Sequence, residues 1–490
     1  MRFSLPAKVF SSFVAVNLKI FNTKGFFMDN SNNQPRERLG SRIGFILLSA
    51  GCAIGVGNVW KFPYITGQYG GGIFVLIYLV FLVILGIPVM TMEFSMGRGA
   101  GASPVKMHQV LTPNKPAWRA HGFGALIANI MLMMFYTSVT GWMLQYFVYS
   151  VNGTLDSATT PEASGAIFSG MLSNPGMLIL FMGIVVLLGS LVCAFDISKG
   201  LEKVTNVMMT ALLVLIIVLA IHSFTLPGAG EGLKFYLLPS IENIEKAGLH
   251  NVIVAAMNQA FFTLSLGIGS MAIFGSFIDK KRSLLGESVN ITILDTFVAI
   301  TAGLIIFPAC FTYGIKPDNG PNLIFVTLPT VFANMPGGRI WGSLFFLFMA
   351  FAAISTIFAV FQNIISCVQE LFHLKKWVAA LICGVGLFVL SIPCVLGFNL
   401  WAGFEPLGAG TGILDLEDYI VSNILLPLGS LAVVLYCNHK IGWGFENFKN
   451  EANQGKGLKV KNWMRVYFAY ILPIIIGIIL VYGIVSPFIG

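Results

Sequence analysis

Two short stretches combine glycine with polar side chains in the middle of long apolar segments. They are Gly51–Asn58 (GCAIGVGN) and Thr263–Ser270 (TLSLGIGS), and each contains a Gly-x-Gly triplet. Glycine inside a helix is about 1 kcal/mol less favourable than alanine, and backbone left unpaired in lipid costs several kcal/mol more. Unwound backbone is tolerated where it lines a cavity, and there its carbonyl and amide groups can bind an ion or a polar solute. The alternative interpretation is close helix packing through small residues.

Three charged side chains also fall within apolar segments. They are Lys61, Glu93 and Asp295, and a charge at mid-membrane costs about 2.5–3.5 kcal/mol. Such a residue indicates a function by default. Lys61 lies near the end of its segment, where its ammonium can instead reach the interface. Glu93 and Asp295 lie deeper, so a purely structural role is harder to sustain for them.

The sequence carries no constellation for hydrolysis, redox chemistry or ATP use. Its six histidines lie in loops or at the ends of apolar segments, and it has no HExxH, GxSxG or P-loop sequence. The seven cysteines include no CxxC pair and lie in or beside apolar segments, so we expect small buried hydrophobes. These features argue against an enzyme and against an ATP-driven pump.

The elements that must position these residues are membrane-spanning helices. Of the 490 residues, 56% are apolar and 10% are charged, whereas soluble domains average about 25% charged residues. Runs of about 20 apolar residues predict an all-α membrane protein with eleven transmembrane helices. These lie near residues 42–65, 72–97, 122–150, 176–196, 201–224, 250–278, 288–314, 339–372, 377–397, 416–437 and 466–488.

The two glycine-rich stretches fall in the first and sixth of these spans. Glycine-interrupted spans at matching positions of two halves indicate a transporter site at the midplane of an inverted repeat. We therefore expect a 5+5 inverted repeat with discontinuous helices 1 and 6. The single transmembrane domain would cover residues 36–490, with repeat one at about 42–224, repeat two at about 250–437 and an extra helix at about 466–488. Residues 1–35 are expected to be an N-terminal leader, with Met28 as the preferred start codon.

The distribution of Lys and Arg predicts the orientation in the membrane. With the N-terminus in the cytoplasm, 24 of the 29 Lys and Arg residues fall on the cytoplasmic side, in keeping with the positive-inside rule. An odd number of spans then puts the C-terminus outside. The net charge of +8 is thus a topology signal, and no nucleic-acid partner is expected. We expect a multi-pass protein of the inner (plasma) membrane with no obligate protein partner.

Several long motifs within the spans match a known family. The first begins at Arg36 and reads RERLGSRIGFILLSAGCAIGVGNVWKFPY, and GIPVMTMEFSMGR follows in the second span. Later motifs are FFTLSLGIG in the sixth span, AGLIIFPA in the seventh and DLEDYIVSNILLPLG in the tenth. Through these motifs the chain closely resembles the neurotransmitter:sodium symporter family, in its bacterial eleven-span branch with the leucine-transporter fold. The resemblance implies a sodium-coupled transporter of amino acids without an organic cofactor.

The resemblance implies two sodium sites built from hard oxygen ligands. The first, which the substrate carboxylate completes, would be formed by Ala53, Asn58, Thr263 and Asp295. The second would be formed by the carbonyls of Gly51, Ile54 and Ala352 and the hydroxyls of Ser355 and Thr356. Without the resemblance, the two hydroxyls would more simply be interpreted as bonding back onto their own helix.

The resemblance also implies how an amino acid would be held. Its carboxylate would meet the amides of Val56 and Gly57 at the start of a half-helix, where the dipole favours anions, and the Tyr136 hydroxyl. Its amine would face the carbonyls of Ala53, Phe262 and Thr263. The side-chain pocket, which implies a large apolar or aromatic substrate, would be lined by Leu132, Tyr136, Phe262, Ser265, Ile268, Ile357 and Val360.

Three further roles follow from the resemblance. Lys61 and Asp418 would form an outer gate, in which lysine replaces the commoner arginine and lacks its bidentate fork. Phe262 with Tyr136 would form an aromatic lid over the substrate. Glu93 would accept hydrogen bonds from the unwound part of the sixth span.

The chain departs from parts of the family at four positions. Asp295 stands where other members have a neutral asparagine, and Ala299 stands where chloride-dependent members have a serine. Both differences predict independence from chloride. Gly55 stands where transporters of monoamines have an aspartate, which favours a substrate with its own carboxylate. Thr210 replaces a proline of many bacterial members, so unwinding of the fifth span on inward opening is in doubt.

These observations together predict a symporter that imports amino acids with sodium by alternating access. The favoured substrates are large apolar or aromatic amino acids, and chloride is not required. Two alternatives remain open at this point. One is a proton-coupled amino-acid permease of the same fold, and the other is an amino-acid sensor that does not translocate its ligand.

Overall fold

Helices make up most of the described chain. A computed structural model describes residues 39–197, 200–240, 245, 248–314 and 322–489. Within these ranges the only β-type pairing is an isolated bridge between Arg282 and Lys456. The expected leader, residues 1–35, lies outside the described residues.

Nine helices of the described chain are long and apolar enough to cross a membrane, and one bent pair makes a tenth. The bent pair is α3 (Arg42–Ala53) followed by η1 and α4 (Gly57–Gln68), with an angle of 54° between the two halves. The nine are α5–α6 (Gly72–Ala100), α8 (Arg119–Val151), α10 (Pro175–Ala194), α11 (Leu201–Ser223), α16 (Leu284–Thr312), α18 (Gly338–Phe372), α19 (Lys376–Leu396), α20–α21 (Ile413–Asn438) and α23–α24 (Met464–Ile489).

The sixth predicted span is divided into two short helices. These are α14 (Leu249–Thr263) and α15 (Ser270–Gly275), and neither is long enough to cross a membrane alone. The turn between them contains Ser265, Gly267 and Gly269, all with positive φ. Gly267 cannot carry a side chain, because a Cβ there would collide with the carbonyl oxygen of Leu426. The backbone is therefore broken where the glycine pattern predicts it, while the count of eleven spans and the inverted repeat stay predictions.

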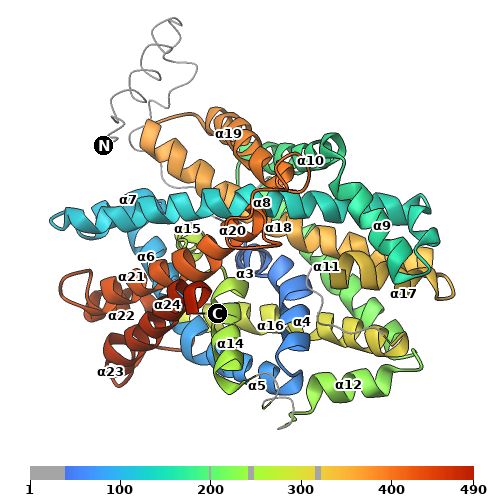
Figure 1. The fold of residues 1–490 in the computed structure, drawn as a ribbon. Coiled ribbons are helices and arrows are strands. Elements are labelled where there is room, and N and C mark those ends of the chain that lie inside the picture. The colour runs from blue at the N-terminus through green and yellow to red at the C-terminus, as the bar shows by residue number, and fades with distance from the viewer. Residues whose placement is uncertain (1–38, 198–199, 241–244, 246–247, 315–321, 490) are drawn as a thin grey trace, which may run out of the picture.

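Short helices in the connections were not anticipated from the sequence. Figure 1 shows most of them at the periphery, with α7 and α22 on one side and α9 and α12 on the other. Their bounds are α7 (Pro104–Leu111), α9 (Pro161–Leu172), α12 (Ala229–Leu237), α17 (Leu328–Ala333) and α22 (Phe445–Ala452).

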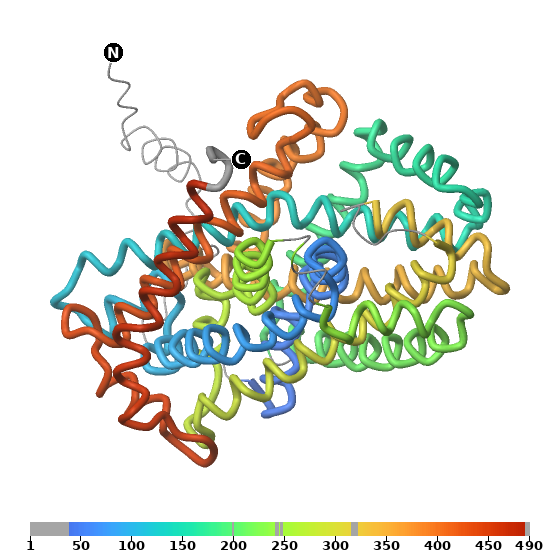
Figure 2. Tube along the Cα trace, turned by 60° about the horizontal axis from the view of Figure 1, so that its bottom comes forward, coloured from blue at the N-terminus to red at the C-terminus, as the bar shows by residue number. Residues whose placement is uncertain are grey.

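The two broken helices lie in the interior and are held by longer helices. α3 packs on α11 and α18, α15 packs on α6, and α8 runs along α18. Both views place α22 and α23 at one end of the molecule and α9 at the other, with α3 between them (Figure 1, Figure 2). The breaks themselves touch, since the Ser265 hydroxyl donates to the carbonyl of Cys52 at 3.2 Å. The fold therefore brings the two glycine-rich stretches to one place.

Candidate ion and solute site

Asp295 of α16 is fully buried beside the break in the first helix. Its Oδ1 accepts a hydrogen bond from Asn58 Nδ2 at 2.8 Å, and the Thr263 hydroxyl lies 3.2 and 3.3 Å from its two oxygens. Asn58 also accepts from the Gly55 amide at 3.0 Å, which ties the unwound backbone to the same group. In the part of the chain that the structure describes, no cationic side chain pairs with Asp295. A buried carboxylate without a partner charge is costly, so this position favours a cation.

A second group of oxygens lies on the other side of the same break. Thr356 Oγ1 is 3.2 Å from the carbonyl oxygen of Gly51 and 3.4 Å from that of Ile54. Ser355 Oγ is 3.4 Å from the Ile54 carbonyl and 2.8 Å from that of Ala352 in its own helix. All five residues of the second predicted sodium site are therefore brought together.

The spacing of these oxygens suits a small monovalent or divalent cation. Oxygens about 2.4 Å from an ion, the distance typical of Ca²⁺, lie about 3.4 Å apart along the edge of an octahedron. Na⁺ has nearly the same radius as Ca²⁺. The oxygen–oxygen separations of 2.8–3.4 Å around Ser355 and Thr356 fall close to this edge. The group around Ser355 and Thr356 is neutral, whereas the group around Asp295 carries a carboxylate.

Ala53 is the one predicted ligand of the first site whose placement is less direct. It is buried and lines the central pocket described below, and no side-chain hydrogen bond ties it to Asp295. The structure thus gathers Asn58, Thr263 and Asp295 by hydrogen bonds, and places Ala53 next to them along the broken backbone.

A small pocket lies between the broken helices. Its volume is about 20 Å³, which is room for about one water molecule. Seven predicted substrate residues line it, namely Ala53, Gly57, Leu132, Tyr136, Phe262, Ser265 and Ile268. The pocket must widen to accept an amino-acid side chain.

Four predicted substrate residues do not line this pocket. Val56 lines the neighbouring outer cavity and donates from its amide to the Tyr136 hydroxyl at 2.9 Å. Thr263 faces Asp295, while Ile357 and Val360 are fully buried in α18. The last two therefore pack in the core of this conformation.

Four pocket residues were not predicted as substrate contacts. Thr356 also belongs to the second predicted sodium site, and Gly55 and Cys52 lie in the first glycine-rich stretch, so proximity in sequence could have suggested them. Leu426 is the first residue of α21, directly after the π-helix Ile420–Leu425, and although it lies in the DLEDYIVSNILLPLG motif its residue type does not indicate a pocket contact.

Gly55 and Gly57 are needed at the break because no side chain fits there. A Cβ at Gly55 would collide with the hydroxyls of Tyr136 and Thr356, and one at Gly57 would lie 2.9 Å from the Phe262 ring. Gln259 donates to the Gly57 carbonyl at 2.9 Å and so satisfies one of the freed backbone groups. An aspartate at position 55 would therefore clash as well as add charge, and such a variant cannot report on charge alone.

A larger cavity of about 220 Å³ lies on the other side of Phe262 and Tyr136. These two aromatic residues line both cavities and so form the wall between them. Lys61 and Asp418 lie on its rim, with Lys61 Nζ 3.1 and 3.0 Å from the two carboxylate oxygens. The same ammonium contacts Ser422 at 3.1 Å and stands 4.0 Å above the Phe262 ring. The predicted gate pair and the predicted lid therefore touch each other.

Glu93 of α6 is fully buried beneath the turn of the sixth span. Its Oε1 accepts a hydrogen bond from the Gly267 amide at 2.6 Å. This is the arrangement predicted for it, because a carboxylate can satisfy backbone groups that the broken helix leaves free.

Comparison with known proteins identifies the family. The profile of the Sodium:neurotransmitter symporter family matches residues 36–164 and 166–488. An uncharacterised sodium-dependent transporter of Bacillus subtilis is 33% identical over 457 residues, which cover 93% of this chain and all of that protein. A second, from Haemophilus influenzae, is 30% identical and matches over 92% of this chain and 99% of its own length.

A solved structure extends the likeness to three dimensions. The crystal structure of MhsT in complex with L-phenylalanine is 35% identical, superposes with a TM-score of 0.82, and covers 91% of this chain and all of its own. The chain belongs to the sodium:neurotransmitter symporter family, whose members are membrane-embedded secondary transporters that use sodium and are not enzymes.

Proposed function

We propose that this protein is a sodium-coupled symporter that imports amino acids with large apolar or aromatic side chains. Two sodium ions would bind, one at Asp295 with Asn58, Thr263 and Ala53, and one at the oxygens around Ser355 and Thr356. Transport would proceed by alternating access across eleven spans arranged as a 5+5 inverted repeat.

One observation carries this proposal. Asp295 is a fully buried carboxylate that meets only neutral donors, Asn58 and Thr263, at 2.8–3.3 Å. A sodium ion at this position would supply the missing positive charge. A substrate carboxylate bound to the same ion would then couple the two ligands, which is the basis of symport.

The substrate class rests on the walls of the central pocket. Leu132, Phe262, Ile268 and Leu426 present apolar surface, and polar groups come from the broken backbone and Tyr136. The related transporter MhsT has been solved with L-phenylalanine. An amino acid with an apolar side chain matches these walls, because its side chain would contact the apolar surface and its zwitterionic end would contact the polar groups.

Independence from chloride follows from two residues of α16. Asp295 already provides a fixed negative charge near the ion, and Ala299, one turn further along the helix, is buried and has no ligand for an anion. Several relatives are named sodium- and chloride-dependent transporters, among them a taurine transporter of Bos taurus that is 25% identical to this chain. We therefore place this protein apart from them in its anion requirement.

The proposed orientation puts the N-terminus in the cytoplasm and the C-terminus outside the plasma membrane, because Lys and Arg gather on one side.

Two sodium ions entering with a neutral zwitterion would carry two charges. At about 2.3 kcal/mol per charge per 100 mV, and about 1.4 kcal/mol per tenfold gradient for each ion, the driving force is roughly 7 kcal/mol. It would support an accumulation of about 10⁵-fold, which is ample for scavenging.

Uptake into proteoliposomes tests the proposal and its rivals. Labelled L-phenylalanine should accumulate with an inward sodium gradient and not when choline replaces sodium. Uptake driven by a proton gradient in choline would favour a proton-coupled permease. Sodium-dependent binding without counterflow would favour a sensor. Competition by the twenty amino acids against the labelled substrate would then rank the side chains.

A further inference from the structure

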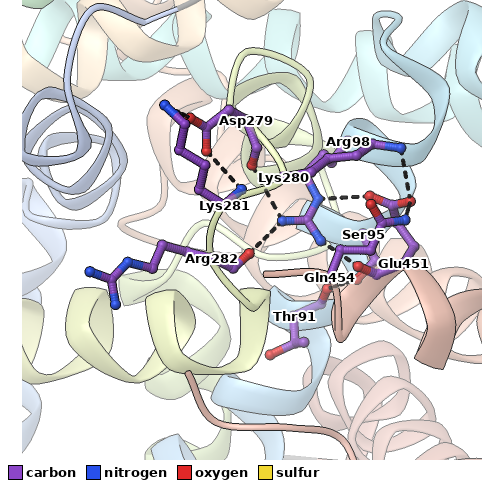
Figure 3. Close-up of polar contacts among 9 residues, drawn as sticks. All are labelled: Thr91, Ser95, Arg98, Asp279, Lys280, Lys281, Arg282, Glu451 and Gln454. Atoms are coloured by element: carbon purple, nitrogen blue, oxygen red, sulfur yellow. Dashed lines mark hydrogen bonds and ion pairs between the residues drawn. The ribbon is translucent and has the colours of Figure 1, made fainter. Parts of the chain in front are cut away.

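Arg98 is an almost fully buried arginine at the end of α6, away from the proposed binding site. Its side chain is 2% exposed, and its guanidinium donates to two segments of the chain that are distant in sequence, α22 and the loop 279–282 (Figure 3). Nε bonds Glu451 Oε1 at 2.7 Å, and a second nitrogen bonds the Glu451 carbonyl. A third nitrogen bonds the carbonyls of Arg282 at 2.7 Å and Asp279 at 3.5 Å.

Glu451 is the matching carboxylate on α22, in the connection between α21 and α23. It is 8% exposed, and its second oxygen accepts from Gln454 at 2.8 Å and lies 3.6 Å from the Lys280 ammonium. Removal of one partner from such a buried pair leaves an uncompensated charge. The pair therefore holds α22 firmly against α6 and the loop 279–282.

Backbone contacts reinforce this junction. The Lys456 amide donates to the Lys281 carbonyl at 2.9 Å, and the Ser283 amide donates to the Lys456 carbonyl at 3.0 Å. Gly455 makes the close approach feasible, because a Cβ there would collide with the backbone of Lys281. The same loop also meets the start of the first span, where the Leu39 amide donates to the Phe277 carbonyl at 3.3 Å.

Helix α6 thus holds the half-helix α15 at both ends. Glu93 accepts from Gly267 just before α15, and Arg98 donates to Asp279 and Arg282 just after it. Between them, a Cβ at Gly97 would collide with the carbonyl of Ala272, so the two helices touch backbone to backbone. The residues that precede α15 line the central pocket. Only the six-residue helix α15 and the turn before it lie between the contacts of Arg98 and the lining of the pocket.

We propose that Arg98 and Glu451 are positioning residues of the transport cycle. Together they fix α15 and the loop 279–282 against α6. This attachment keeps the pocket closed on the side of α22 until Arg98 and Glu451 separate. The inference rests on the proposed function only in taking the side of α22 as the cytoplasmic side, toward which the pocket opens. No predicted site residue lies in α22, so the Arg98–Glu451 pair is an addition to the site already described.

Cys52 offers a native reporter for this proposal, because it is buried and lines the pocket. Its labelling by a small charged thiol reagent would be measured from the cytoplasmic face of everted vesicles, at low and high sodium. A Cys52→Ser protein gives the background from the six other cysteines. The test variants are Glu451→Gln, Arg98→Gln and Gly455→Ala. The matched control is Lys281→Gln, whose side chain is 86% exposed and pairs only at the surface with Asp279.

In wild type, sodium should protect Cys52 from the reagent. Each test variant should raise the labelling rate in low sodium by about fivefold or more, the lower end of usual couplings between sites. High sodium should restore protection, because it shifts an equilibrium between intact conformations. Lys281→Gln should behave as wild type.

Two results would overturn the inference, and each differs from a failure of the proposed function. Unchanged labelling in Glu451→Gln and Gly455→Ala, with sodium protection intact in wild type, shows that the junction does not position α15. Labelling that rises but ignores sodium, together with a lowered thermal midpoint, shows a merely structural role. Absence of sodium protection in wild type would instead count against the proposed ion site.

Discussion

Asp295 is fully buried and accepts hydrogen bonds only from neutral donors. Its carboxylate therefore requires a positively charged ligand. A cation in contact with it relieves the burial of charge, and a substrate carboxylate on the same cation extends the network. Ser355 and Thr356, by contrast, would present only neutral oxygens to the proposed second ion. The two groups should therefore respond differently to mutation.

The anion requirement can be tested at Asp295 and Ala299. Sodium-driven uptake by wild type should be unchanged when gluconate replaces chloride, because the fixed carboxylate takes the role of an anion. Asp295→Asn combined with Ala299→Ser removes that charge and offers a hydroxyl ligand, so uptake should become chloride-responsive. A several-fold loss of wild-type uptake in gluconate would contradict this interpretation.

Sodium titrations of substrate binding should separate the two ion sites. Ser355→Ala removes one ligand from a site that involves only protein, so sodium affinity should fall and high sodium should largely restore binding. Asp295→Ala removes the charge that the ion and the substrate share, so both affinities should fall together. Ser355 is preferable to Thr356 because Thr356 also lines the pocket. Equal defects that sodium rescues in both variants would argue against a shared site at Asp295.

At the scale of single residues, the sequence predicted which polar groups lie together better than it predicted the lining of the pocket. The motif around Gly51–Asn58 is specific, and the structure joins its residues to Thr263, Asp295 and Thr356 by hydrogen bonds. Leu426 was missed because it enters the pocket only through the packing of α21. Ile357 and Val360 pack in the core because the pocket is narrow in this conformation.

At the scale of elements, the positions of the glycines in the sequence predict where the two helices break. Positive φ at Gly267 and Gly269 and the crowded Gly55 explain why both spans unwind. The sequence could not show that α15 has only six residues, or that Ser265 also takes positive φ, since α15 packs on α6 and Ser265 contacts Cys52 of α3, which are distant in sequence. The fifth span continues unbroken through Thr210, whose hydroxyl bonds the Asn206 carbonyl at 2.8 Å.

The turn of the sixth span should depend on Glu93. Glu93→Ala removes the acceptor of the Gly267 amide, and loss of a hydrogen bond to a charged group costs about 1.5–3 kcal/mol. We expect a lower thermal midpoint and weaker sodium and substrate binding in purified protein. Ser95→Ala in the same helix is the control, because Ser95 bonds only the Thr91 carbonyl of its own helix. Equal effects of the two substitutions would show that Glu93 has no special role.

At the scale of the whole molecule, the two cavities are separated by Phe262 and Tyr136 and capped by the Lys61–Asp418 pair. Pairs of this kind join segments hundreds of residues apart, as does Arg98 with Glu451. The outer pair could be predicted by resemblance to a family. The Arg98 pair could not, because nothing in the GIPVMTMEFSMGR motif that ends at Arg98 indicates Glu451 as its partner.

Release of substrate to the outside should be faster when the outer pair is broken. The side chains of Lys61 and Asp418 are 25% and 33% exposed, so the ion pair is worth about 1 kcal/mol or less, and the contact with Phe262 adds about 0.5–1 kcal/mol. Lys61→Gln should therefore speed dissociation of labelled substrate by up to about thirtyfold. Lys234→Gln, an exposed lysine of α12, is the control. An unchanged dissociation rate would remove this pair from the gate.

Linked binding of sodium and substrate tests the central claim most directly. Equilibrium binding of labelled L-phenylalanine to the purified wild-type protein would be measured across a range of sodium concentrations. The affinity of the protein for sodium would then be measured with and without L-phenylalanine. Because both ligands would meet at Asp295, each should raise the affinity for the other by the same factor. Substrate affinity that does not vary with sodium would contradict the shared site at Asp295, and with it the proposed mechanism of symport.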